Sequence, residues 1–270
     1  GMNIKDIAQT RYKDIEDGKF DEILKYIEVN DDSHGLLASV EYCWREQGLP
    51  IPDEFGWNVE STVPIGQGLK SSSALSCAAL RALNSYAWTG LSNSEIADLS
   101  AKSQLMSNCA ITGSMDDNWA SLEPGWKLVD PSLGASDSII IQGEVDDSLS
   151  VLVCLRGERF REISLTRFSE QSQIFERSLA SIMSGAALDS LSSNGMAVSA
   201  ATGDHEALRI SNLCIASGAI ASGISGSGPA IAVVCFEDDT ASISEIIDEM
   251  GYSTIQTRFA SNASLVEEAS

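Results

Sequence analysis

The sequence predicts a fold of mixed helices and strands, in α+β or α/β layers, from two observations. Alternating or β-branched runs that are typical of strands occur at 57–63, 138–142, 149–155, 231–236 and 252–260. Between them lie longer stretches with apolar residues at helical spacing, at 71–88, 92–105, 169–183, 187–201 and 204–218. Glycine and proline separate many of these segments, as expected for turns.

Local signals define the first elements. Residues 3–30 are charged and mildly amphipathic, and residues 31–33 predict the cap of a second helix that ends at Gly48. Pro50 and Pro52 then predict a loop before the first strand.

Capping residues define three later helices. Ser92 and Glu95 form an S-x-x-E capping box, and Ser242 with Glu245 repeats that pattern. Asp204 predicts the cap of the helix between them.

The length of 270 residues suits one large or two modest domains with ample core. The pattern changes to successive helices near residue 156, so we place a boundary between 145 and 160. The resulting domains are 1–150 and 151–270.

The composition excludes several classes of partner. A net charge of −22 argues against nucleic acid and anionic membrane surfaces. No apolar run reaches the length of a membrane span, and no secretion signal is evident, so we expect a cytoplasmic protein. The six cysteines show no CxxC spacing, which favours buried free thiols in a reducing compartment. A chain with only two histidines argues against a histidine-based metal site or a His-dependent triad.

A glycine-rich stretch, PIGQGLKSSSALSCAAL at residues 64–80, predicts a phosphate site. Gly66 and Gly68 let the backbone approach a ligand, and the following helix N-terminus presents unpaired N–H groups and a positive dipole end. Lys70 adds a positive charge, and the serines at 71–73 add hydroxyls. The string is not a Walker motif, because no Lys-Ser/Thr pair closes it.

Two further strings gain weight beside the first. TGSMDDN at 112–118 contains adjacent carboxylates, and GISGSGP at 223–229 is a second run of small residues. Taken alone, TGSMDDN is a solvated turn or helix cap, and GISGSGP is a tight turn. Phosphoryl transfer needs a phosphate cradle, a cation and a carboxylate near the attacking hydroxyl, and the three strings together supply them.

In combination the strings resemble the GHMP kinase superfamily. Its PxxxGLGSSAA motif is similar to PIGQGLKSSSA, and its SGxGP string is similar to SGSGP at 225–229. Lys70 within GLKSSSA, together with TGSMDDNWAS, resembles the branch of archaeal-type shikimate kinases. The resemblance covers roughly residues 33–262.

The resemblance implies an α+β fold with an N-terminal half like domain 2 of ribosomal protein S5 and a ferredoxin-like C-terminal half. It implies transfer of the ATP γ-phosphoryl group to the 3-hydroxyl of shikimate with Mg²⁺, by a monomer or homodimer. Asp117 would act as base or orienting group, and Lys70 would offset charge on the transferred group. Ser72 would ligate Mg²⁺, and residues 226–228 would close over the substrate side. The nucleotide-binding residues implied are Gly66, Gly68, Leu69, Ser71, Ser72, Ser73, Gly226, Ser227 and Gly228.

The chain departs from the superfamily in two places. The N-terminal motif has no counterpart, which predicts a truncated start or a replaced sheet edge. A metal-binding Glu of relatives corresponds to Met106 here, so Asp116, Asp117 or water would supply that ligand. The cations open for binding a substrate carboxylate are Arg156, Arg159, Arg161, Arg209 and Arg258.

Two other functions stay open. One is a different GHMP-type kinase, such as a homoserine kinase. The other is a degenerate relative that binds a nucleotide or metabolite without catalysis, which the missing N-terminal motif and Met106 both favour.

Overall fold

The described residues of the chain form two compact units. The computed structural model describes residues 35–53, 55–64, 66–110, 113, 115–157 and 166–261. The N-terminal unit comprises the described residues up to Thr62, Ser72–Glu123 and Lys127–Ile140. The C-terminal unit comprises Val63–Ser71, Pro124–Trp126 and the described residues from Ile141 onward. The glycine-rich loop therefore belongs to the C-terminal unit. The domain limits 1–150 and 151–270 stay a prediction.

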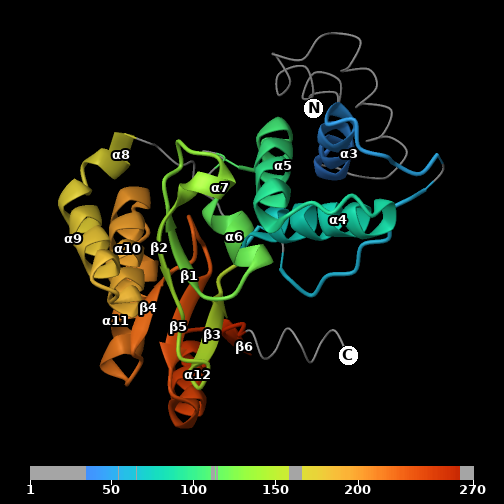
Figure 1. Ribbon diagram of the computed structural model, residues 1–270. Coiled ribbons are helices and arrows are strands. Elements are labelled where there is room, and N and C mark those ends of the chain that lie inside the picture. The colour runs from blue at the N-terminus through green and yellow to red at the C-terminus, as the bar shows by residue number, and fades with distance from the viewer. Residues whose placement is uncertain are drawn as a thin grey trace, which may run out of the picture. The chain divides into compact units, whose positions relative to one another are not determined.

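Four helices dominate the N-terminal unit, and Figure 1 shows them in blue to green: α3 (Leu36–Glu46), α4 (Ser71–Ala87), α5 (Asn93–Met106) and α6 (Asp116–Leu122). Their core is apolar and dense, with Val40, Trp44, Leu80 and Ile96 almost completely buried. The predicted capping box is confirmed, since Ser92 accepts from the Glu95 N–H and Glu95 accepts from the Ser92 N–H. The helix predicted at 71–88 is confirmed as α4. Tyr86, near the end of this helix, is exposed.

A small sheet follows α6. Strands β1 (Trp126–Val129) and β2 (Ile139–Gly143) pair with each other, and the short helix α7 (Ala135–Ser138) lies between them in sequence. The strand predicted at 138–142 is confirmed as β2. Strand β1 was missed, because four residues carry too little alternation to be recognised.

The C-terminal unit is built on a four-stranded antiparallel sheet. The strands are β3 (Ser150–Leu155), β4 (Ala221–Ile224), β5 (Ile231–Cys235) and β6 (Ser253–Arg258). Their order in the sheet is β4-β5-β3-β6, with Leu152 opposite Val233 on one side and Gln256 on the other. Three of these strands were predicted. Strand β4 was not, because its residues ASGI are small and were read as part of a loop.

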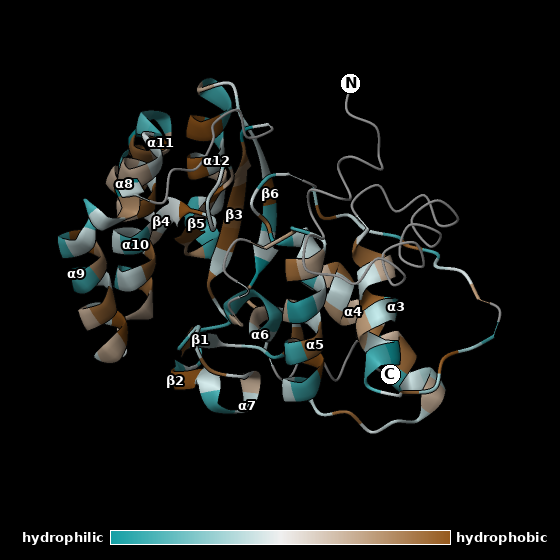
Figure 2. Cartoon of the chain, turned by 90° about the horizontal axis from the view of Figure 1, so that it is seen from above, coloured by the Kyte–Doolittle hydropathy of each residue, from teal (hydrophilic) through white to brown (hydrophobic). Residues whose placement is uncertain are grey.

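Helices cover this sheet. They are α8 (Thr166–Ser169), α9 (Ser172–Met183), α10 (Ala187–Thr202), α11 (His205–Ala216) and α12 (Thr240–Glu249), with a 3₁₀ turn at Glu237–Asp239. On one sheet face Leu152 and Val233 pack with Ile210 of α11 and Ile243 of α12. Figure 2 shows the matching hydrophobic colour along β3 and α12. The opposite face buries Val151 and Val234 with residues of α10, so the alternation read from the sequence does place core residues on both faces.

Helix α10 touches strand β4 through glycines. A Cβ atom added at Gly195 would lie 2.5 Å from the Cα of Gly223, and one added at Gly223 would lie 2.8 Å from the Leu191 carbonyl oxygen. The two backbones therefore meet directly, and no side chain fits between them.

Two predictions of elements were wrong. Residues 57–63 form no strand and belong to neither of the two sheets of the described chain. Trp57 instead donates its indole N–H to Glu41 at 2.7 Å and packs edge-on against Phe55, while Val59 stays exposed. Helix α12 begins at Thr240 rather than after a Ser242 cap, because the 3₁₀ turn leads directly into it.

The segment 3–30 and the cap predicted at residues 31–33 lie outside the described residues. The helix predicted to follow that cap is α3, which begins at Leu36 after Gly35 and ends at Glu46. Within the part of the chain that the structure describes, no helix has the length and apolarity needed to cross a membrane.

Candidate active site

Two glycine loops lie against each other within the C-terminal unit. Ser225 donates its hydroxyl to the Gly68 carbonyl oxygen at 3.0 Å, and the Ala230 N–H donates to the Gln67 carbonyl oxygen at 2.9 Å. A Cβ atom at Gly68 would lie 2.6 Å from the Gly228 carbonyl oxygen. The structure thus brings together two of the three strings that sequence reasoning singled out. Glycine is required at 68 both for this approach and for its φ of 78°.

Lys70 joins the two loops through its side chain. Its backbone has φ 58°, in the left-handed region that non-glycine residues rarely adopt. A Cβ atom at Gly226 would lie 2.6 Å from Lys70 Cε and 3.3 Å from Nζ, so the lysine side chain crosses directly over Gly226. Strained backbone at a charged residue is typical of functional sites, where surrounding contacts hold the conformation.

The serines after Lys70 start helix α4. Ser71 is its first residue, and the first four N–H groups of any helix have no partner within that helix. Acidic residues are absent from this first turn, so nothing there counters the positive end of the helix dipole. Ser72 is half-buried and Ser73 is buried. The turn can therefore bind an anion, as predicted from the sequence.

A buried polar network lies under these serines, inside the N-terminal unit. The hydroxyls of Ser72 and Ser73 donate to Gln104 Oε1 at 3.1 and 3.0 Å. Gln104 Nε2 donates to Asn118 Oδ1 at 2.7 Å, and Ser100 donates to the same oxygen at 2.6 Å. Sequence reasoning missed Gln104 and Asn118. A polar residue on the buried face of α5 was the available signal, because buried polar groups are nearly always hydrogen-bonded.

The two adjacent carboxylates lie in the first turn of α6. Asp116 is exposed and Asp117 is half-buried, and the next residue, Asn118, belongs to the buried network. Residues 112 and 114 of the same string lie outside the described residues. Asn118 thus connects this turn to the buried network. Asp117 and the glycine loops belong to different units, so the role of Asp117 stays a prediction.

Met106 lies among apolar groups. It packs against the core of the N-terminal unit, and the Cys43 thiol approaches its sulfur at 3.4 Å. Position 106 is therefore part of that core and supplies no oxygen ligand.

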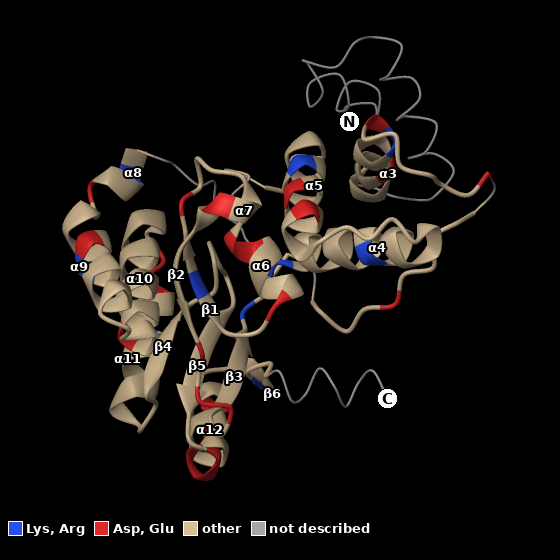
Figure 3. Ribbon diagram, viewed as in Figure 1, with Lys and Arg blue, Asp and Glu red and all other residues tan. Residues whose placement is uncertain are grey.

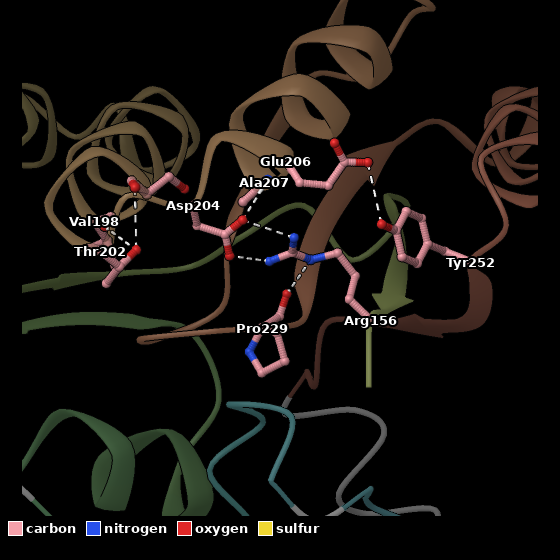
Figure 4. A network of polar contacts seen from close by, with 9 residues as sticks. Arg156, Val198, Thr202, Asp204, Glu206, Ala207, Pro229 and Tyr252 are labelled. Carbon is pink, nitrogen blue, oxygen red and sulfur yellow. Dashed lines mark hydrogen bonds and ion pairs between the residues drawn. The ribbon is translucent and has the colours of Figure 1, made fainter. Parts of the chain in front are cut away.

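The guanidinium group of Arg156 makes hydrogen bonds and an ion pair within the protein. Its guanidinium makes a bidentate ion pair with Asp204, and its Nε donates to the Pro229 carbonyl oxygen at 2.7 Å (Figure 4). The side chain is only 7% exposed. Asp204 also caps α11 by accepting from the Ala207 N–H, as predicted. Arg156 thereby fixes the end of the second glycine loop.

Two further arginine candidates are also paired. Arg209 contacts Glu206 through two hydrogen bonds, which hold the pKa of that carboxyl below its usual range. Arg258 pairs with Glu237 at 3.3 Å. Arg159 and Arg161 lie outside the described residues. In Figure 3 the Lys and Arg residues of the described chain are scattered along the elements of both units.

The cysteines agree with the prediction of buried thiols. All six are free, and five are buried. Burial raises the pKa of the Cys154 thiol to about 12 and that of Cys214 to about 11. Such thiols are poor nucleophiles, so catalysis through cysteine is not favoured.

The residues present fit a nucleotide and Mg²⁺. The glycines at 68 and 226 let the two loops pack against each other and let Lys70 lie over the second loop, which brings a positive charge to it. Gln67 Oε1 is buried without a hydrogen-bond partner among the described residues, and donor groups of a nucleotide would satisfy it. No group of three or more acidic, His or Cys residues is gathered in the described chain. Mg²⁺ in kinases commonly uses few protein ligands plus substrate phosphates, which suits the Ser72 hydroxyl oxygen.

The comparisons with known proteins define the class. Residues 36–125 match the family model described as the GHMP kinases N terminal domain. The chain belongs to the GHMP kinase family.

Curated relatives of the chain include shikimate kinases. The one from Thermoplasma acidophilum is 30% identical over 68% of this chain and 66% of its own length. The one from Methanobrevibacter smithii is 29% identical over 76% of this chain and 72% of its own length. The alignments thus span only about two thirds of these relatives. Among solved structures, a homoserine kinase from Cytophaga hutchinsonii has a TM-score of 0.58 at 16% identity, covering 83% of this chain and 75% of that one. That likeness shows the fold alone.

Proposed function

We propose that this protein is a small-molecule kinase that transfers the γ-phosphoryl group of ATP to the 3-hydroxyl of shikimate. The observation that carries the proposal is the contact between the two glycine loops, with Lys70 lying across Gly226. The similarity to curated shikimate kinases supports the choice of substrate.

The roles of the residues follow from their chemistry. The backbone at 66–68 and the α4 N-terminus bind the phosphates, and Lys70 offsets charge on the transferred group. Asp117 orients the substrate hydroxyl and takes its proton while that oxygen bonds to the γ-phosphorus and ADP leaves. Ser72 holds Mg²⁺ together with the phosphates, and the bound ion supplies charge neutralisation.

The finer features of the fold belong to the same proposal. Two observations support a ferredoxin-like C-terminal half. The elements follow one another along the chain as β3, helices, β4, β5, α12 and β6, and the strand order in the sheet is β4-β5-β3-β6. The S5-like N-terminal half, the cytoplasmic location and a monomeric or dimeric state stay predictions.

A coupled assay of ADP release tests the proposal, with shikimate, homoserine and mevalonate offered in parallel. We expect turnover with shikimate and no turnover with the other two. Turnover of homoserine alone would assign the protein to the other GHMP-type kinase instead.

Asp117→Asn tests the catalytic role. We expect a fall in kcat of about 100-fold or more with little change in ATP affinity, because the carboxylate acts on the substrate hydroxyl. Equal losses of kcat and ATP affinity would make Asp117 a structural or metal-binding group. Tight ATP binding by the unmodified protein, with no phosphorylated product from any hydroxyl substrate, would favour the non-catalytic relative.

A further inference from the structure

Gln104 is buried where helices α4 and α5 meet. Only 3% of the residue is exposed. Its side-chain oxygen accepts from Ser72 Oγ at 3.1 Å and from Ser73 Oγ at 3.0 Å. An amide oxygen has two lone pairs, so these two hydroxyl protons occupy both.

Asn118 determines which end of the Gln104 amide faces the serines. Asn118 Oδ1 accepts from Gln104 Nε2 at 2.7 Å and from the Ser100 hydroxyl at 2.6 Å. Ser100 Oγ lies 3.1 Å from Gln104 Nε2 and gives that group a second acceptor. With its nitrogen held in this way, Gln104 presents its oxygen to Ser72 and Ser73.

This arrangement restricts what Ser72 can do. A serine hydroxyl has one proton, and that of Ser72 is already donated to Gln104. Ser72 therefore has no proton left for a phosphate oxygen, which is itself only an acceptor. Its remaining lone pair suits a cation. Ser73 is buried, whereas Ser72 is half-buried, so Ser72 is the serine of this pair that a bound ion can reach.

We propose that Gln104 is a positioning residue that commits the Ser72 hydroxyl to the metal ion of a metal–nucleotide complex rather than to a phosphate oxygen. The inference rests on the proposed function, because it requires a nucleotide bound with Mg²⁺. It adds a residue outside all three sequence strings to the site.

The experiment measures ADP binding to the full chain by calorimetry, with and without MgCl₂. The readout is the ratio of the two dissociation constants, which is the tightening caused by Mg²⁺. Gln104→Met keeps the side-chain length and removes the acceptor. We expect it to reduce the ratio by about fivefold to tenfold, the effect of losing one oriented hydrogen bond, with little change in Mg²⁺-free affinity.

Three further variants make the result specific. Gln104→Glu keeps an acceptor for both serines, and we expect it to keep the ratio. Ser72→Ala should reduce the ratio as Gln104→Met does, and the double variant should add nothing, because both act through one hydroxyl. Asn84→Leu is the matched control: it removes an amide at the other end of α4, which contacts Thr89 and Leu91, and should leave the ratio unchanged.

An unchanged ratio in folded Gln104→Met would overturn the inference, as would additive losses in the double variant. Where Gln104→Met does not fold, loss of the ratio in folded Gln104→Glu would overturn it equally. Failure of the unmodified protein to bind ADP under either condition would contradict the proposed function, and the inference with it.

Discussion

Two polar networks, each at least partly buried, hold the parts of the candidate site, and they differ in charge. In the N-terminal unit, Ser72, Gln104 and Asn118 are joined by neutral amides and hydroxyls. In the C-terminal unit, Arg156 and Asp204 form an ion pair that holds the Pro229 carbonyl. The first network orients side chains at the start of α4, and the second fixes the backbone of a loop.

The difference in charge predicts a difference in tolerance. Losing one member of a neutral network leaves one or two polar groups unsatisfied, each at a moderate cost. Losing one member of a buried ion pair leaves an uncompensated charge away from water, which costs far more. The charged network should therefore contribute more to folding, and the neutral network more to the direction of individual hydroxyl groups.

The largest expected effect is that of Asp204→Asn. Asparagine still caps α11 but leaves the Arg156 charge unpaired, so we expect a loss of about 3–5 kcal/mol in the free energy of unfolding. Ser100→Ala, in the neutral network, should cost about 1–3 kcal/mol. Urea denaturation measures both.

Arg209→Met is the matched control for the charge. Its ion pair with Glu206 is exposed, and its loss should cost about 0–1 kcal/mol. If Asp204→Asn cost no more than Arg209→Met or Ser100→Ala, the contrast between the networks would be wrong.

Gly68→Ala tests the contact that the charged network supports. The new Cβ would meet the Gly228 carbonyl oxygen at 2.6 Å, so we expect a loss of about 2–4 kcal/mol and weaker ATP binding. Gly66→Ala is the control, because Gly66 has a similar φ of 75° but open space around it, and it should cost only about 1–2 kcal/mol. Equal effects of the two substitutions on stability and ATP affinity would mean that the loop contact is unimportant.

Lys70→Gly separates charge from backbone strain. Glycine adopts φ 58° without strain, so stability should stay level or rise by about 1 kcal/mol. The kcat should fall by about 100-fold with the loss of the ammonium group. Thermal unfolding and steady-state kinetics measure the two quantities. A variant that is stabilised and fully active would exclude Lys70 from catalysis.

The smallest expected effect concerns alkaline pH in the C-terminal unit. The folded protein holds the pKa of Cys154 at about 12 and that of Cys214 at about 11, above the value of an unfolded thiol. The folded state thus keeps protons that the unfolded state releases, so stability is complete below about pH 8.5 and decreases above it. We expect about 1 kcal/mol per thiol between pH 7.5 and 9.5. Cys154→Ala should reduce this slope, and an unchanged slope would contradict the assignment.

The sequence predicted the parts of the fold that depend on local chemistry. The capping box at Ser92, the Asp204 cap and the alternation of β3 are all properties of neighbouring residues. Strand β4 and the run at 57–63 were read wrongly, because a strand is defined by its place in a sheet as well as by its own residues.

The site shows the same division. The glycines and Lys70 could be found because phosphate binding requires a recognisable string. Gln104 was missed and the pairing of Arg156 could not be foreseen, since Asn118 and Asp204 are 14 and 48 residues away from them and meet them only in the folded chain. The surroundings of Met106 could not be predicted either, because its contact with Cys43 depends on packing in the folded chain.

The segment Val63–Ser71 has a consequence for how the protein unfolds. It contacts residues 225–230 but lies between two segments of the other unit, and the chain returns to that unit again after Trp126. A protease cut or a gene division near residue 150 would therefore separate the loop from its own partners rather than release two intact pieces. We expect limited proteolysis to yield no stable half, and both units to melt in one cooperative transition.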